Sequence, residues 1–205
     1  MVLKRQARIV GTAARRLSWA LVLGLVPLLG ACASPSAAQT RELLDESSGS
    51  TLLIVQRPIV FARARTDVAA NARDYATVVA MHEDRSGKYS TWLIVHRWST
   101  VDPRFAGATG AGSGQLRIIA DDRELTFNAA VPEPAFLQRR SGMFEPSTRG
   151  ALSSAYSVDS PTLHYIASAQ TLSLRYSDDP LPIPYTVWED GRAALQAWLS
   201  DTRTP

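Results

Sequence analysis

The chain has 205 residues, with 22 Lys and Arg against 19 Asp and Glu and a formal net charge of +3. Five of the basic residues lie within the first 16 positions, so the rest of the chain carries 17 basic and 19 acidic residues and a net charge of −2. This balance argues against a nucleic-acid partner, and the single cysteine, Cys32, excludes an intrachain disulfide.

The first 32 residues have the layout of an export signal. A basic segment without acidic residues is followed by an almost continuous apolar run at 19–29, which is short for a bilayer span of about 20 residues. Leu29, Gly30 and Ala31 then precede Cys32. This tetrad resembles the lipobox of bacterial lipoproteins, in which an apolar residue and two small residues lead to the cysteine that becomes lipidated.

The lipobox resemblance implies that residues 1–31 are a signal peptide, and that Cys32 becomes the first mature residue, acylated on its sulfur and its amino group. Several acyl chains are enough to hold a protein on a bilayer. Ala33 follows the cysteine, and in such lipoproteins a residue other than Asp there implies the outer membrane, with the domain facing the periplasm, rather than the inner membrane. Two alternatives remain: a cleaved signal with an incidental cysteine, and a short signal anchor.

Residues 32–50 predict a lipidated tether, and residues 51–205 predict one periplasmic domain. The tether is rich in small and polar residues, with one helical turn expected at 41–46. In the domain, segments 52–55 and 61–65 predict strands, and Pro58 predicts an edge position or a break near them. Runs at 75–82 and 89–98 flank a polar turn and predict a hairpin. Apolar residues on both faces of the second run predict a central strand.

The second half of the domain predicts further strands and two helices. A hairpin is expected from 116–120 and 124–130, and long loops from the glycine-rich segment 107–114 and from 131–150. Asp159, Ser160 and Pro161 predict a helix start, residues 171–176 and 183–188 predict strands, and Asp190 predicts the start of a last helix. The expected fold class is therefore α+β, mainly an antiparallel, sandwich-like β-sheet with two short late helices.

The segment 163–199 is loosely similar to the end of the invasion-associated locus B-type periplasmic proteins. The similarity lies in Leu163, Ile166 and Ala167, in a strand that ends near Arg175, and in the run 191–195. It implies a binding or envelope role and transfers no catalytic residue.

No motif in the domain predicts catalysis, a cofactor or a metal. A hairpin register that pairs His82 with residues 89–91 leaves His96 about 17 Å away at ~3.3 Å per residue, so the two cannot share a zinc ion. Each pair of adjacent acidic residues falls at a predicted turn or helix start, where Asp bonds the local backbone. The glycine-rich segment lacks both a phosphate-loop lysine and a central serine.

Four side chains are candidates for binding. Arg63 and Arg65 are expected on one strand face beside Phe61, where they can meet an anionic envelope component such as lipid headgroups or peptidoglycan carboxylates. The alternative is a solvated face that acidic neighbours balance. Trp92 and Trp98 can line a pocket, or they can pack in the core as alternate residues of a central strand.

The function expected from the sequence is that of a lipid-anchored envelope lipoprotein with a non-enzymatic domain that binds a ligand or an envelope protein. The alternative is a lipid-anchored envelope hydrolase with a dispersed active site, since a catalytic triad can assemble from distant positions.

Overall fold

The computed structural model describes residues 40–46, 48–101, 114–138, 151–179 and 181–202. The signal peptide, Cys32, the first part of the tether, most of the glycine-rich segment and the end of the 131–150 loop lie outside the described residues. In the part of the chain that is described, no helix is long and apolar enough to cross a membrane.

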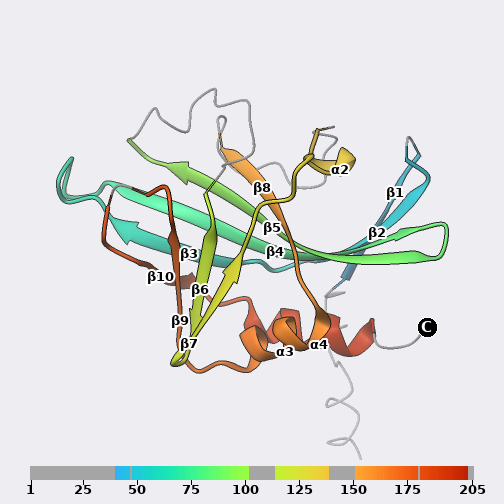
Figure 1. The fold of residues 1–205 in the computed structure, drawn as a ribbon. Coiled ribbons are helices and arrows are strands. Elements are labelled where there is room, and N and C mark those ends of the chain that lie inside the picture. The colour runs from blue at the N-terminus through green and yellow to red at the C-terminus, as the bar shows by residue number, and fades with distance from the viewer. Residues whose placement is uncertain (1–39, 47, 102–113, 139–150, 180, 203–205) are drawn as a thin grey trace, which may run out of the picture. The chain divides into compact units, whose positions relative to one another are not determined.

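The described residues form an antiparallel sheet with three short helices (Figure 1). The strands are β1 (Thr40–Asp45), β2 (Ser50–Val55), β3 (Ile59–Ala64), β4 (Arg73–Arg85), β5 (Lys88–Ser99), β6 (Leu116–Ala120), β7 (Arg123–Phe127), β8 (Leu152–Ser157), β9 (Leu172–Tyr176) and β10 (Tyr185–Glu189). The helices are α2 (Ala135–Gln138), α3 (Ser160–Ser168) and α4 (Arg192–Asp201). This confirms the predicted α+β, sandwich-like class, with α2 as an additional helix.

The long hairpin of β4 and β5 lies at the centre of the sheet, as predicted. β4 pairs with β5 on one side and with both β2 and β3 on the other, and β5 also pairs with β8. The hairpin turn is tighter than expected, because Ser86 and Gly87 alone connect the strands, both with positive φ. The break at Pro58 separates β2 from β3, which follow each other along the same edge of β4.

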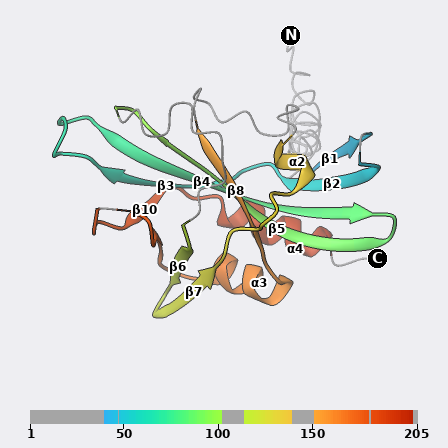
Figure 2. The same cartoon turned by 45° about the horizontal axis from the view of Figure 1, so that its top comes forward.

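The sheet curls until its two ends meet. From β3 it continues through β10, β9 and β6 to β7. Just after β7, Ala129 forms a bridge with Tyr156 of β8, and the Ala130 amide donates to the Ala155 carbonyl at 2.8 Å. Strands β6, β7 and β9 therefore lie across from β4 and β5, and Figure 2 shows this for β6 and β7. One face of every strand in this circuit points into a shared interior.

The hydrophobic core fills most of this interior and is closed at one end by α3 and α4. Leu93, Val95, Leu116 and Ile118 are among its buried side chains. The two helices pack against each other. α3 begins at the predicted position, where the Asp159 carboxylate accepts the Thr162 amide at 2.8 Å.

Two stretches form strands that the sequence did not predict. Residues 40–45, expected to hold a helical turn of the tether, pair with β2 along its whole length, from Thr40 opposite Val55 to Asp45 opposite Ser50. The sheet therefore begins before residue 51. β8 was missed as well, because its small and polar residues (Leu-Ser-Ser-Ala-Tyr-Ser) give no clear alternation.

The interior face of β5 carries Leu93 rather than Trp92, which gives a first prediction. Leu93 is fully buried, whereas Trp92 lies on the outer face and is partly exposed. Leu93→Ala should lower the free energy of unfolding by about 2–5 kcal/mol, as for other buried leucines. Trp92→Ala should lower it by less. Urea unfolding of the full-length protein measures both, and the reverse order would place the core on the other face.

Candidate functional site

A group of charged side chains occupies the end of the interior that lies away from the helices; its arginines and Asp74 are buried, whereas Asp67 and Asp178 are exposed. We call this group the arginine cluster; it consists of Arg63, Arg65 and Arg97 with the carboxylates of Asp67, Asp74, Asp178 and Asp179. Asp74 lies at the start of β4. His82 lies eight residues later on the same strand, roughly 26 Å away, and its ring stacks on Trp198 of α4 with 4.3 Å between the ring centroids. The core is thus bounded by apolar packing against the helices at one end and by the arginine cluster at the other.

Arg63 is the centre of the cluster. Its Nε and Nη2 donate to Asp74 Oδ2 at 3.0 and 2.8 Å, and its Nη1 lies 2.6 Å from Asp179 Oδ2. The side chains of Arg63 and Asp74 are 1% and 0% exposed. Arg65 adds a second cation, with Nη1 at 3.2 Å from Asp74 and Nη2 at 2.9 Å from Asp67. Burial lowers the pKa of Arg63, but its interactions with Asp179, Tyr185 and Asp74 together outweigh burial and raise that pKa.

Arg97 brings the third cation from β5. Its Nη1 and Nη2 donate to Asp178 Oδ1 and Oδ2 at 3.3 and 3.4 Å, so that each nitrogen faces its own carboxylate oxygen. The guanidinium also lies over the Tyr176 ring, 4.0 Å from its centroid. Gly114 leaves room for the Asp178 carboxylate in this position, because a Cβ at residue 114 would collide with it.

Tyrosines from three strands line the same end of the interior. Tyr176 of β9 and Tyr185 of β10 meet edge to face at 6.2 Å, and Arg63 lies over the Tyr185 ring at 4.4 Å. Tyr156 of β8 is also buried. Within the described part of the chain, the Tyr176 and Tyr185 hydroxyls are buried and have no hydrogen-bond partner. Burial raises the pKa of both phenols, which therefore stay protonated and can donate.

A cluster of this kind costs stability. A buried ion pair recovers its desolvation penalty only in part, and well-packed apolar residues of similar volume often serve folding as well or better. Buried charges and unsatisfied phenols at one end of a core are features that cluster at functional sites. The arginine cluster is therefore the main candidate functional site.

The structure places Arg63 and Arg65 differently from the sequence expectation. They share one side of their strand segment, beside Phe61, as expected. Both are enclosed in ion pairs with Asp67, Asp74 and Asp179, however, and not on an open face. The reason is the curl of the sheet, which turns this side of β3 inward.

Sequence reasoning missed Arg97 and the two aspartates that follow β9. Asp178 and Asp179 were interpreted only as a turn signal, although their carboxylates reach Arg97 and Arg63. One signal was present: Arg97 continues the face of Leu93 and Val95, so it is a charged residue at an inward position of a central strand.

The structure does not bring Trp92 and Trp98 together. Both lie on the outer face of β5, six residues apart, or roughly 20 Å. Trp98 stacks on Tyr75 at 4.1 Å, and Tyr75 meets the exposed Trp188 edge to face at 6.3 Å. Trp92 instead packs against Phe136 of α2 at 5.7 Å. Trp92 is partly buried and packs against the hydrophobic core from the outer face of β5. Trp98 is also partly buried and belongs to an aromatic group with Tyr75 and the exposed Trp188.

The histidines of the hairpin lie on opposite faces. His82 pairs with Thr91 across the hairpin, inside the predicted register, and its Nδ1 lies 2.7 Å from the Thr91 hydroxyl. His96 Nδ1 lies 2.7 Å from Ser153 Oγ on the outer face. Among the described residues, no three His, Cys, Asp or Glu side chains form a group that could hold a metal ion.

The buried histidine on β5 predicts a pH dependence of stability. Burial lowers the pKa of His96 to about 4, whereas a histidine in the unfolded chain titrates near 6.5. Between these values the unfolded chain binds the proton and the folded chain does not, so the free energy of unfolding falls as the pH drops from about 6.5 to about 4. The loss from His96 is at most roughly 3 kcal/mol.

Urea unfolding of the full-length protein at several pH values measures this slope. His82 adds to it, since burial lowers its pKa as well. A His96→Gln variant should lose part of the slope, while His164→Gln, on α3, serves as the control. If the free energy of unfolding changed equally with pH in wild type and His96→Gln, His96 would not be a source of the pH dependence.

No protein-family model, curated protein or solved structure matches this chain.

Proposed function

We propose that this protein is a lipoprotein of the bacterial cell envelope, anchored by acyl groups on Cys32. The support is the order of a basic segment, an apolar run and the tetrad that ends in Cys32. With Ala33 after the cysteine, the proposed location is the outer membrane, with the domain facing the periplasm. The membrane is then its first partner.

We propose further that the anchored domain binds a ligand or an envelope partner without catalysing a reaction. The observation that carries this proposal is the arginine cluster. Guanidinium groups with fixed hydrogen-bonding geometry recognise anionic groups. The groups around them are carboxylates and protonated phenols, which can bind and orient a ligand. We therefore favour an anionic envelope component as the partner, and we propose that it binds at the arginine cluster.

A thermal-shift experiment tests binding against catalysis. A ligand that binds only the folded state raises the melting temperature by mass action. The full-length protein in detergent is melted with fractions of solubilised envelope, and each active fraction is analysed before and after incubation. We expect at least one fraction to raise the melting temperature by a few degrees, with its ligand recovered unchanged. A ligand recovered as a product, or no shift with any fraction, would contradict the proposal.

One observation favours the alternative of an envelope hydrolase. The 2.7 Å contact between Ser153 Oγ and His96 Nδ1 pairs a hydroxyl with an imidazole, as in nucleophilic serine enzymes. Against it stands the low pKa of His96, about 4, which makes the imidazole a weak base. The contact also joins directly opposed residues of β5 and β8, where small polar side chains commonly bond across strands.

A fluorophosphonate probe decides whether Ser153 is activated, because it reacts covalently with nucleophilic serines. We expect no labelling of the full-length protein. Labelling that Ser153→Ala abolishes, and that the neighbouring Ser154→Ala preserves, would establish the hydrolase instead.

A further inference from the structure

Strand β1 lies at one end of the sheet. Among the described strands it pairs with β2 alone, and Figure 1 shows it beside β2 at one side of the fold. The other end of the sheet, β7, is joined to β8 by the bridge between Ala129 and Tyr156. An edge strand can pair with a further strand through its outward backbone groups. We propose that β1 pairs antiparallel with β1 of a second copy of this chain.

The turn after β1 shows which backbone groups of the strand point outward. The Asp45 carbonyl accepts the amides of Ser48 and Gly49 at 3.2 and 2.8 Å, so it faces the turn and β2. Successive residues of a strand direct their amide and carbonyl groups to opposite sides. Glu42 and Leu44 therefore direct these groups away from β2, where a further strand can bond them.

The sequence of β1 is self-complementary in one antiparallel register. When Leu43 lies opposite Leu43 of the second copy, Arg41 lies opposite Asp45 of that copy, and symmetry forms this pair twice. The outward groups of Glu42 and Leu44 then bond each other across the two-fold axis. Opposite charges on directly opposed residues stabilise a strand pair, so charge favours a second copy as the occupant of this edge.

The neighbouring registers that use the same outward groups oppose like charges. A register centred on Glu42 places two copies of this glutamate opposite each other, and one centred on Leu44 places Glu42 opposite Glu46. Like charges directly opposite each other destabilise a strand pair. The charges of β1 therefore select the register centred on Leu43.

The proposed pairing keeps the contacts that β1 already makes. Its hydrogen bonds with β2 lie on the other edge of the strand. Asp45 keeps the hydrogen bond from Ser48 Oγ at 2.6 Å, because a carboxylate accepts several donors. Leu44, which is 67% exposed in the single chain, is covered in part by the second copy, which removes apolar surface from water.

The alternative role of these charges is protection. Charged side chains on an edge strand often prevent it from pairing with another chain. In that case the protein is a monomer, and reversing one charge of β1 leaves it a monomer. A two-fold pairing predicts the opposite result for both measurements.

Sedimentation velocity of the full-length protein in detergent tests the pairing. Wild type should sediment as a dimer. Arg41→Glu and Asp45→Arg each oppose two pairs of like charges, so each should raise the dissociation constant at least about tenfold. An equimolar mixture of the two variants should form dimers again, because each copy supplies the charge that the other needs. Arg57→Glu, the same change at an exposed residue between β2 and β3, should match wild type.

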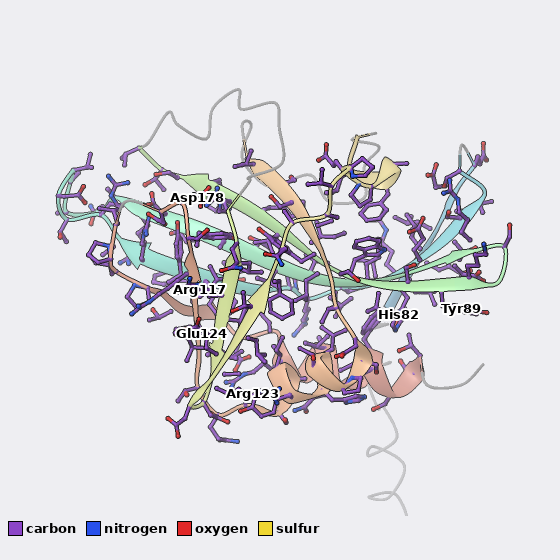
Figure 3. The ribbon with its side chains drawn as sticks, in the orientation of Figure 1. His82, Tyr89, Arg117, Arg123, Glu124 and Asp178 are labelled. Atoms are coloured by element: carbon purple, nitrogen blue, oxygen red, sulfur yellow. The ribbon has the colours of Figure 1, made fainter. Side chains whose placement is uncertain are left out.

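Cysteine cross-linking tests the register, and it also decides the matter if Asp45→Arg does not fold. Opposed residues of a non-hydrogen-bonded pair have Cα atoms about 4.5 Å apart, which suits a disulfide. Leu43→Cys should therefore oxidise to a covalent dimer. Tyr89→Cys is the control; Tyr89 is 71% exposed and lies at the tip of the β4–β5 hairpin (Figure 3), so this variant should stay uncross-linked.

Three results would each overturn the inference. They are a monomeric wild type, a dimer that Arg41→Glu leaves as tight as before, and equal cross-linking of Leu43→Cys and Tyr89→Cys. Failure of the mixed variants to form dimers would likewise exclude the register centred on Leu43. Lipid labelling at Cys32 and the envelope-fraction melts are separate measurements, so the proposed function can stand when this inference fails.

Discussion

Asp74→Ala is expected to lower the free energy of unfolding by about 3–5 kcal/mol, because it leaves two buried guanidinium groups without their shared counter-ion. Asp74 is fully buried and accepts hydrogen bonds from both Arg63 and Arg65. Urea unfolding of the full-length protein measures the loss. If the variant does not fold, Asp74→Asn, which keeps the shape and one acceptor, should show a smaller loss in the same direction.

The matched control is an exposed ion pair on the same sheet. Arg117 of β6 and Glu124 of β7, both labelled in Figure 3, lie 3.7 Å apart with side chains about half exposed. Glu124→Ala should change the free energy of unfolding by less than about 1 kcal/mol. A loss at Asp74 as small as that at Glu124 would mean that the arginine cluster is solvated and is not the buried site described here.

Cys32→Ser is expected to abolish lipidation completely, since serine has no thiol for the acyl transfer that the lipobox resemblance implies. Cells grown with an alkyne fatty acid should label the wild-type protein and leave the variant unlabelled. The variant should also migrate away from the mature size. Ser34→Ala, two residues further on, is the control and should be labelled as wild type is. Absence of label in wild type would remove the anchor from the proposed function.

Much of the fold could be predicted because local signals agreed with tertiary structure. The β4–β5 hairpin has long β-rich runs on either side of Ser86 and Gly87, and α3 has Asp159 as its N-cap before Pro161. The buried face of α4, which includes Leu195 and Trp198, follows helical spacing. In each case a few neighbouring residues determine the structure.

The rest depended on pairings between distant segments. β8 is polar and is a strand because it fills the open edge of β5, and β1 is a strand because it covers β2. The arginine cluster likewise depends on contacts between segments that are distant in the sequence. The curl of the sheet turns Arg63 inward and brings it to Asp179, 116 positions later in the chain. Periodicity could place Arg63 on a face but could not show that this face is enclosed.

The intact mass of the wild-type protein, purified from the membrane fraction, tests the proposed lipoprotein most directly. The account predicts a chain that begins at Cys32 and carries acyl groups on both its sulfur and its amino group. A chain that begins at another residue, or one that retains a free Cys32 thiol, would contradict it.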